Sequence, residues 1–500
     1  MLGDVHPGRS HAKIIAEIQE LDDLTKAEIQ RHRDCMTDLA KRKLAAKRRW
    51  NAQIPFTQLP EELIIYIFLL ACSEGGRPLT PLRIGSICHN WRTIAWSAPE
   101  LWSSVAVCLE VQQEAMEIQS DLLESWLRRA KKRPLSIVVT YRDEDIAEWP
   151  PPTADAKALH LVVAYSEQWR SIDLSIPEEW LECLDKLQGK FPLLERLTIE
   201  GAVRFNPEVF SVAPRLRSVA FKLFRYEWEE LGKISLLWSQ LTELSFKAED
   251  IQTCLTVVER CSSLAHLALH QNLQPSFLPS LPPRTITINL DGVTSLHISP
   301  HGKDSLFMDS ISAPHLKDVA VLSPWRTSDF LCSLCALITC SGCAKSITHL
   351  SFVGYIPSEK EMVEFLSKLH NLSQLELDND ERAPSFSNIF IDALRSYALA
   401  SAHSGSSSQR LLPNLVSLLY VGPITLDSHA FLDMLDMRYN IGGAGDGPQL
   451  KSVAVHGYDE SINEIGGLAR AESLRAQGMK VDIGSKRRNF TGLYRDIKFA

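Results

Sequence analysis

The sequence predicts a mixed α/β protein, in which a long helix and a small all-α module precede an irregular solenoid of parallel strands with helical returns. Three observations predict it. Residues 11–49 are poor in Gly and Pro, residues 54–102 hold apolar helical stretches, and one apolar spacing then recurs through the rest of the chain. These observations divide the chain into residues 1–53, 54–102 and 103–484, followed by a basic tail over 485–500.

Composition sets limits on the class of protein. The chain has 500 residues, which exceeds the usual size of a domain with a single compact core. Its 45% hydrophobic and 23% charged content is that of a globular protein. A net charge of -8 argues against nucleic acid as the partner. The N-terminus lacks a signal-like apolar region, and the longest apolar run, 63–72, is too short for a membrane span. With eleven scattered cysteines, we expect reduced thiols and a cytoplasmic or nuclear location, away from membranes.

The first segment is predicted to be a long helix, because Ala, Glu, Lys, Leu and Ile predominate in it. Thr25 and His32 interrupt its apolar stripe, so a clean heptad is not sustained. The stripe consists of Ile14, Ile18, Leu21 and Leu24, continued less regularly by Ile29, Met36 and Leu39. Two interpretations stay open: a coiled coil that joins two copies, or a helix that packs on its own body or remains solvated. The basic cluster 41–49 is either a nuclear import signal or a solvated helix end.

The second segment is predicted to hold two short helices. Pro60 suits a first helical turn, and Glu61 and Glu62 then lie at the positive end of the helix dipole. Gly and Pro in residues 75–78 end this helix, and a second apolar helix follows from Pro81 to the residues before Pro99. The fragment holds more apolar side chains than it can bury alone, so we expect it to pack against a partner or a neighbouring domain.

The order of residues here carries a resemblance. Leu-Pro-x-Glu-Leu-x-x-x-Ile-Phe over 59–68, then Ile-Cys-x-x-Trp-Arg and Pro-x-Leu-Trp, resembles F-boxes of a large fungal family. The resemblance implies binding to the Skp-family adaptor of a cullin-RING ubiquitin ligase. The matching adaptor-facing or core positions are Leu59, Pro60, Ile64, Ile67, Phe68, Ile87, Cys88, Trp91, Leu101 and Trp102. A helical linker with a private core is the alternative interpretation.

The third segment repeats the spacing apolar-x-x-apolar-x-apolar. From Trp169 onward the first positions recur at intervals of 22 to 43 residues. They are Trp102, Trp169, Leu194, Leu216, Leu241, Leu264, Val293, Leu316, Ile347, Leu372, Leu415 and Leu450. The pattern resembles a divergent leucine-rich repeat, whose usual asparagine is matched only at Asn272. A conventional α/β domain is the alternative, and it would not need one fixed motif.

Helical returns are expected between these strands, at residues 120–133, 178–190, 251–261, 328–339, 360–369, 388–402 and 428–439. Flexible loops are expected at 401–408 and 440–448, which are rich in Ser or Gly. Because side chains alternate along a strand, a polar row should face away from the anchors. From this row we select Arg196, Lys222, Lys247, His270, Glu376 and Asp378 as target-binding candidates. Their mixed charge favours a protein ligand.

Catalytic signatures are lacking, since the sequence contains no Walker loop, H-E-x-x-H or G-x-S-x-G. Cys332, Cys335, Cys340 and Cys343 have paired C-x-x-C spacing, but only four residues separate the pairs. We interpret them as buried structural thiols, with zinc as the alternative, and expect no cofactor. The predicted function is therefore substrate recognition for a ubiquitin ligase, and a non-ligase scaffold for protein–protein interaction is the alternative.

Overall fold

The computed structural model describes residues 7–73, 80–109, 113–141, 157–176, 178–187, 189–201, 206, 208–223, 233–248, 251–271, 287–299, 306–323, 329–356, 358–395, 411–440, 449–458, 465 and 469–485. The chain divides into two compact units. One contains residues 1–106 and 120–135, and the other contains residues 107–119 and 136–500. Several predicted features lie outside the described residues. They are the helix-ending residues 75–78, Asn272, the predicted loop 401–408, residues 441–448 of the second predicted loop, and the basic tail after Ser485.

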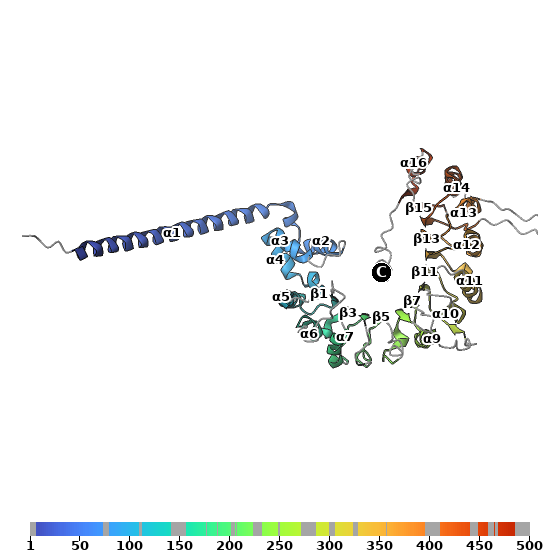
Figure 1. Ribbon diagram of the computed structural model, residues 1–500, viewed down its shortest axis with the longest axis horizontal. Helices are drawn as coiled ribbons and strands as arrows, with labels where there is room; N and C mark the ends of the chain where they lie inside the picture. Colours follow the sequence, from blue (N-terminus) through green and yellow to red (C-terminus); the bar gives the residue numbers. More distant parts are fainter. Residues whose placement is uncertain are drawn as a thin grey trace, which may run out of the picture. The chain divides into compact units, whose positions relative to one another are not determined.

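The first unit is helical (Figure 1). Its elements are α1 (Pro7–Asn51), η1 (Pro55–Gln58), α2 (Glu61–Ser73), α3 (Thr80–Ile87), α4 (His89–Ser97) and η2 (Pro99–Trp102), joined by most of α5 (Gln113–Ala130). The long helix predicted for residues 11–49 is confirmed as α1. Pro60 directly precedes α2 and does not lie in its first turn, and Pro99 opens the short turn η2 after α4. The single second helix predicted from Pro81 is divided into α3 and α4, because Cys88 between them has an extended backbone.

The second unit is built on a ladder of strands. Its sheet has 14 strands, and their order follows the sequence except that β8 (Ile288–Asn289) pairs separately with β10 (Ile311–Ser312). The strands are β1 (Ser104–Leu109), β2 (Leu135–Tyr141), β3 (Trp169–Ser175), β4 (Arg196–Gly201), β5 (Ser218–Leu223), β6 (Glu243–Ala248), β7 (His266–Gln271), β9 (Ser295–Ser299), β11 (Asp318–Ser323), β12 (His349–Gly354), β13 (Gln374–Asn379), β14 (Ser417–Gly422), β15 (Ser452–Gly457) and β16 (Lys480–Ser485). From β3 onward each strand pairs in parallel with the next.

The repeated apolar positions meet across this ladder. Leu197 lies opposite Val219 and Ile199 opposite Phe221, and the same register places Leu375 beside Leu418 and Leu377 beside Tyr420. All of these side chains are buried. The prediction of parallel strands in one register is therefore confirmed, and the fold is a solenoid-like α/β arrangement. Each repeat covers the apolar side of the next, because no repeat can bury that side alone.

Helices return the chain between strands. They are α6 (Lys157–Ala164), η3 (Ser166–Gln168), α7 (Glu178–Leu181), η4 (Glu182–Leu187), η5 (Trp238–Gln240), α9 (Ile251–Glu259), α10 (Leu306–Asp309), α11 (Asp329–Ser341), η6 (Cys343–Lys345), α12 (Glu359–Leu366), α13 (Asn388–Arg395), α14 (Ser428–Asn440) and α16 (Ala469–Ala476). Figure 1 shows α9 to α14 along one side of the strand ladder, so these helices cover one face of the sheet. All seven predicted returns contain helix, whereas α6, α10 and α16 were not predicted.

Candidate functional site

The outward side of α2 presents four large apolar side chains to solvent. Leu63, Tyr66, Ile67 and Leu70 are 50%, 60%, 39% and 43% exposed. Their spacing of three, one and three residues places them along one side of the helix. We call these four residues the α2 stripe. An exposed apolar row of this kind is typical of a surface that binds another protein.

The opposite side of α2 belongs to the core of the first unit. Ile64 and Phe68 are 1% and 2% exposed. The ring of Phe68 lies 5.1 Å from that of Trp91, and Phe56 lies 4.9 Å from Trp91. These centroid distances are those of favourable aromatic pairs. The core of this unit is thus filled by its own aromatic side chains, while the α2 stripe remains outside it.

A tryptophan cluster closes the other end of this core. Trp102 is fully buried, and its indole Nε1 donates a hydrogen bond of 2.7 Å to the carbonyl oxygen of Ala95. Trp96 and Trp126 meet it edge-on, with centroids 5.2 and 4.7 Å away. The guanidinium of Arg129 lies 4.9 Å from the ring of Trp102, within the range of cation–π attraction. Residues of α5 therefore hold Trp102 in place.

The junction of α3 and α4 depends on Gly85 and Cys88. A Cβ atom at Gly85 would lie 1.9 Å from the ring of Trp96, so only glycine permits this approach of the two helices. Arg92 donates from Nε to the carbonyl of Gly85 at 2.8 Å. Cys88 has extended backbone angles, and its Sγ accepts a hydrogen bond from the N–H of Trp91 at the start of α4.

The ten predicted adaptor-binding residues thus occupy different environments. Ile64, Phe68, Leu101 and Trp102 are buried in the core, because their side chains point toward the packed helices. Leu59, Pro60, Ile67 and Ile87 are exposed, and Cys88 and Trp91 are half-buried. The ten predicted residues did not include Leu63, Tyr66 and Leu70, which share the exposed stripe with Ile67. Their periodicity relative to Ile67 was the available signal.

A second candidate surface lies on the polar face of the sheet. Lys222, Lys247 and His270 occupy equivalent positions on β5, β6 and β7, and Glu200 precedes them on β4. The ammonium of Lys222 lies 3.8 Å from the carboxylate of Glu200. Burial lowers the pKa of His270, and the neighbouring His297, Lys247 and Lys222 lower it further. Two lysines thus lie beside a histidine whose ring is neutral at neutral pH, and Glu200 offsets one of their charges.

The next strands continue this face with a small polar network. Ser295 donates to the carboxylate of Asp318 at 3.0 Å, and His297 Nε2 lies 3.4 Å from the same oxygen. Burial raises the pKa of Asp318, but the hydrogen bonds from His297 and Ser295 and the charges of His297 and His349 together outweigh it, so the pKa is lowered on balance. Asp318 is consequently ionised at neutral pH and adds one anionic position beside the basic row.

The remaining target-binding candidates lie elsewhere on the face. Arg196 on β4 is exposed, as is Glu376 on β13. Asp378 is only 5% exposed, so its carboxylate offers little surface to a protein ligand. Four strand steps separate β7 from β13, roughly 19 Å at the usual strand spacing. The six residues therefore form two groups, a basic one on β4 to β7 and an acidic one on β13.

Asn379 is a structural residue that the sequence did not reveal. It is 1% exposed, and its Oδ1 accepts a hydrogen bond from the N–H of Ile356 in the preceding repeat. Its own carbonyl accepts one from the hydroxyl of Tyr458 at 2.9 Å. The asparagine lies one position before the place expected from the leucine-rich repeat pattern, which is why the pattern missed it.

The four clustered cysteines are distributed over α11 and the turn after it. Cys343 is fully buried, and burial raises the pKa of its thiol to about 11. Cys332 and Cys340 are exposed, so the prediction that all four are buried is wrong for these two. Cys335 accepts a hydrogen bond from the ammonium of Lys368 at 3.4 Å. Among the residues that the structure describes, no three His, Cys, Asp or Glu side chains are grouped so as to hold a metal ion.

The chain matches no protein-family model and no curated protein. Within the described part of the chain, no helix combines the length and the apolar content that a bilayer crossing requires.

Proposed function

We propose that this chain is the substrate-recognition subunit of an SCF-type cullin-RING ubiquitin ligase. Residues 54–102 would form an F-box that binds the Skp-family adaptor, and through it the cullin scaffold. The observation that carries this proposal is the α2 stripe, an exposed apolar row on a helical module whose core is formed by other side chains, among them Ile64, Phe68 and Trp102. Because the core forms without the four side chains of the α2 stripe, their exposure supports a role in binding.

The polar face of the sheet would bind the target protein. The parallel ladder with anchors in register supports a leucine-rich-repeat-like solenoid, an architecture that offers a long surface for a protein partner. The positive charges of Lys222 and Lys247, beside the uncharged ring of His270, favour an acidic segment of the target. Catalysis would come from proximity alone, because the subunit holds its target near the ubiquitin-conjugating enzyme. This role places the protein in the cytoplasm or the nucleus.

Binding to purified Skp-family adaptor tests the proposal, with substitutions that leave the core intact. We expect Leu63→Glu and Ile67→Glu each to weaken adaptor binding by at least about 100-fold, because a buried carboxylate would replace an apolar contact. Ile118→Glu on α5 is the matched control, since Ile118 is 70% exposed and belongs to a different helix. The control should bind as the unaltered chain does.

The same binding experiment can also contradict the proposal. Phe68→Ala is unsuitable as the main test, because Phe68 is 2% exposed and its loss would destabilise the module itself. If both stripe variants bind as tightly as the control, the α2 stripe is not the adaptor-binding surface. If the folded chain does not bind the adaptor at all, the ligase role is refuted. The chain would then be a scaffold for protein–protein interaction outside the ligase.

A further inference from the structure

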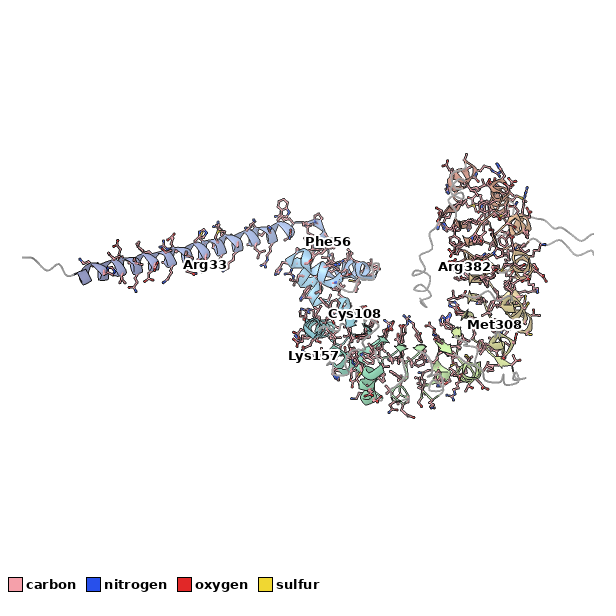
Figure 2. All side chains as sticks on the ribbon, in the orientation of Figure 1. Arg33, Phe56, Cys108, Lys157, Met308 and Arg382 are labelled. Atoms are coloured by element: carbon pink, nitrogen blue, oxygen red, sulfur yellow. The ribbon has the colours of Figure 1, made fainter. Side chains whose placement is uncertain are left out.

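Helix α1 is solvent-exposed along almost its whole length. Every side chain from Lys13 to Trp50 is exposed, which is roughly 55 Å of helix. Figure 2 shows these side chains, Arg33 among them, projecting around the entire helix. A helix owes most of its stability in a protein to packing of an apolar face, so α1 lacks the contacts that usually stabilise such an element.

Six of the exposed apolar side chains of α1 nevertheless form one stripe. Ile15, Leu24 and Leu44 lie outside it, so the assignment of Leu24 to the stripe is corrected. At about 100° per residue, the six fall within an arc of about 80° that also contains Thr25 and His32. They are Ile14, Ile18, Leu21, Ile29, Met36 and Leu39, which are between 48% and 57% exposed. Positions 14, 25 and 36 and positions 18 and 29 repeat every 11 residues. This period matches the α-helix closely and gives a nearly straight stripe, where a seven-residue pattern fails.

Charge is divided between the two halves of α1. Residues 13–28 carry five acidic and two basic side chains, a net charge of -3. Residues 31–49 carry eight basic and two acidic side chains, a net charge of +6. Two parallel copies would place like charges together along the whole helix. Two antiparallel copies would place the acidic half of each against the basic half of the other.

We propose that α1 pairs in antiparallel orientation with α1 of a second copy of this chain. The stripe supplies the apolar contact, and the two charged halves set the orientation. A polyanion would satisfy only the basic half and would leave the stripe exposed, so it fits the observations less well. The proposed dimer would present two copies of each binding surface, which raises avidity for a partner with repeated sites.

Sedimentation equilibrium of the full chain tests the contact. Ile15 and Ile18 offer a matched pair, because both are 54% exposed and Ile15 lies outside the stripe. We expect Ile18→Glu to weaken the dimer by about 100-fold or more, since two symmetric apolar contacts are lost, and Ile15→Glu to change it by less than about threefold. Circular dichroism should show that both variants retain α1.

Salt dependence tests the orientation. For an antiparallel pair, raising the salt concentration from about 0.05 to 0.5 M screens attraction, so the dissociation constant should rise. For a parallel pair it should fall, because repulsion is screened. A dissociation constant that falls with salt, a dimer that Ile18→Glu leaves intact, or a chain that stays monomeric at about 100 µM would overturn the proposal.

Discussion

Replacing Arg438 tests how the solenoid holds together around its longest insertion. Arg438 on α14 is 6% exposed. Its Nε donates to the carbonyl of Leu394 at 3.0 Å, and its Nη1 donates to that of Leu412 at 2.8 Å. Its Nη2 donates to the carbonyl of Leu411. One guanidinium thus joins both ends of the segment between Leu394 and Leu411.

The expected cost follows from the three acceptors. Arg438→Met keeps much of the side-chain volume but leaves three buried carbonyls without this charged donor. A buried carbonyl left without its donor costs about 1–3 kcal/mol, so the three together give about 3–9 kcal/mol. We take the lower part of this range, about 3–5 kcal/mol, as the expected loss, because methionine keeps much of the apolar packing. Leu412 has a φ of 48°, which is unfavourable for a non-glycine residue, so the backbone there should rearrange first when this contact is lost.

Urea unfolding and hydrogen exchange together measure this loss. Amides of α13, β14 and α14 should lose protection first, because neighbouring repeats depend on one another for stability. Arg395→Ala is the control on the adjacent helix. Its ion pair with Asp433 is 3.3 Å long and exposed, so its removal should cost less than about 1 kcal/mol. A loss below about 1 kcal/mol for Arg438→Met would refute the reasoning.

Two further predictions follow. The pKa of His270 is lowered mainly by burial, so below pH about 6.5 the unfolded chain binds a proton that the folded chain does not, and stability falls by up to about 1.4 kcal/mol per pH unit. His270→Asn should therefore flatten the loss of unfolding free energy between pH 7.5 and 5.5, and an unchanged slope would contradict this assignment. Gly85→Ala should destabilise the helical unit by about 1–3 kcal/mol, because its Cβ would overlap Trp96, whereas Ser86→Ala should have little effect in the same thermal melts.

The solenoid could be predicted largely from sequence because each strand places its anchors on one buried side. Twelve strands of the sheet carry the predicted spacing. The spacing missed two strands, because a residue that is not a large apolar one holds the first anchor position in each. In β2 the first anchor position holds Lys132, and in β16 it holds Gly478. Both strands still bury alternate apolar residues, as Leu135, Ile137 and Val139 do in β2, so period two alone would have found them.

The sequence indicated α2 as the candidate binding surface, but it did not show which side of this helix is exposed. Ile67 and Phe68 are adjacent, equally apolar and part of the same motif, yet one is 39% exposed and the other 2%. Helical periodicity shows that they point in different directions, but both directions carry apolar residues on α2. Only the packing of Phe56 and Trp91 determines which direction is the core.

Sequence alone determined the order of the elements, the register of the repeated strands and the length of α1, because these depend on local propensity and on short-range apolar periodicity. Tertiary structure alone decided which apolar residues remain outside, that Asp378 is covered, and that Arg438 reaches three carbonyls up to 44 residues away. These features depend on contacts between segments distant in the chain, and such contacts leave no periodic trace in the residues that make them.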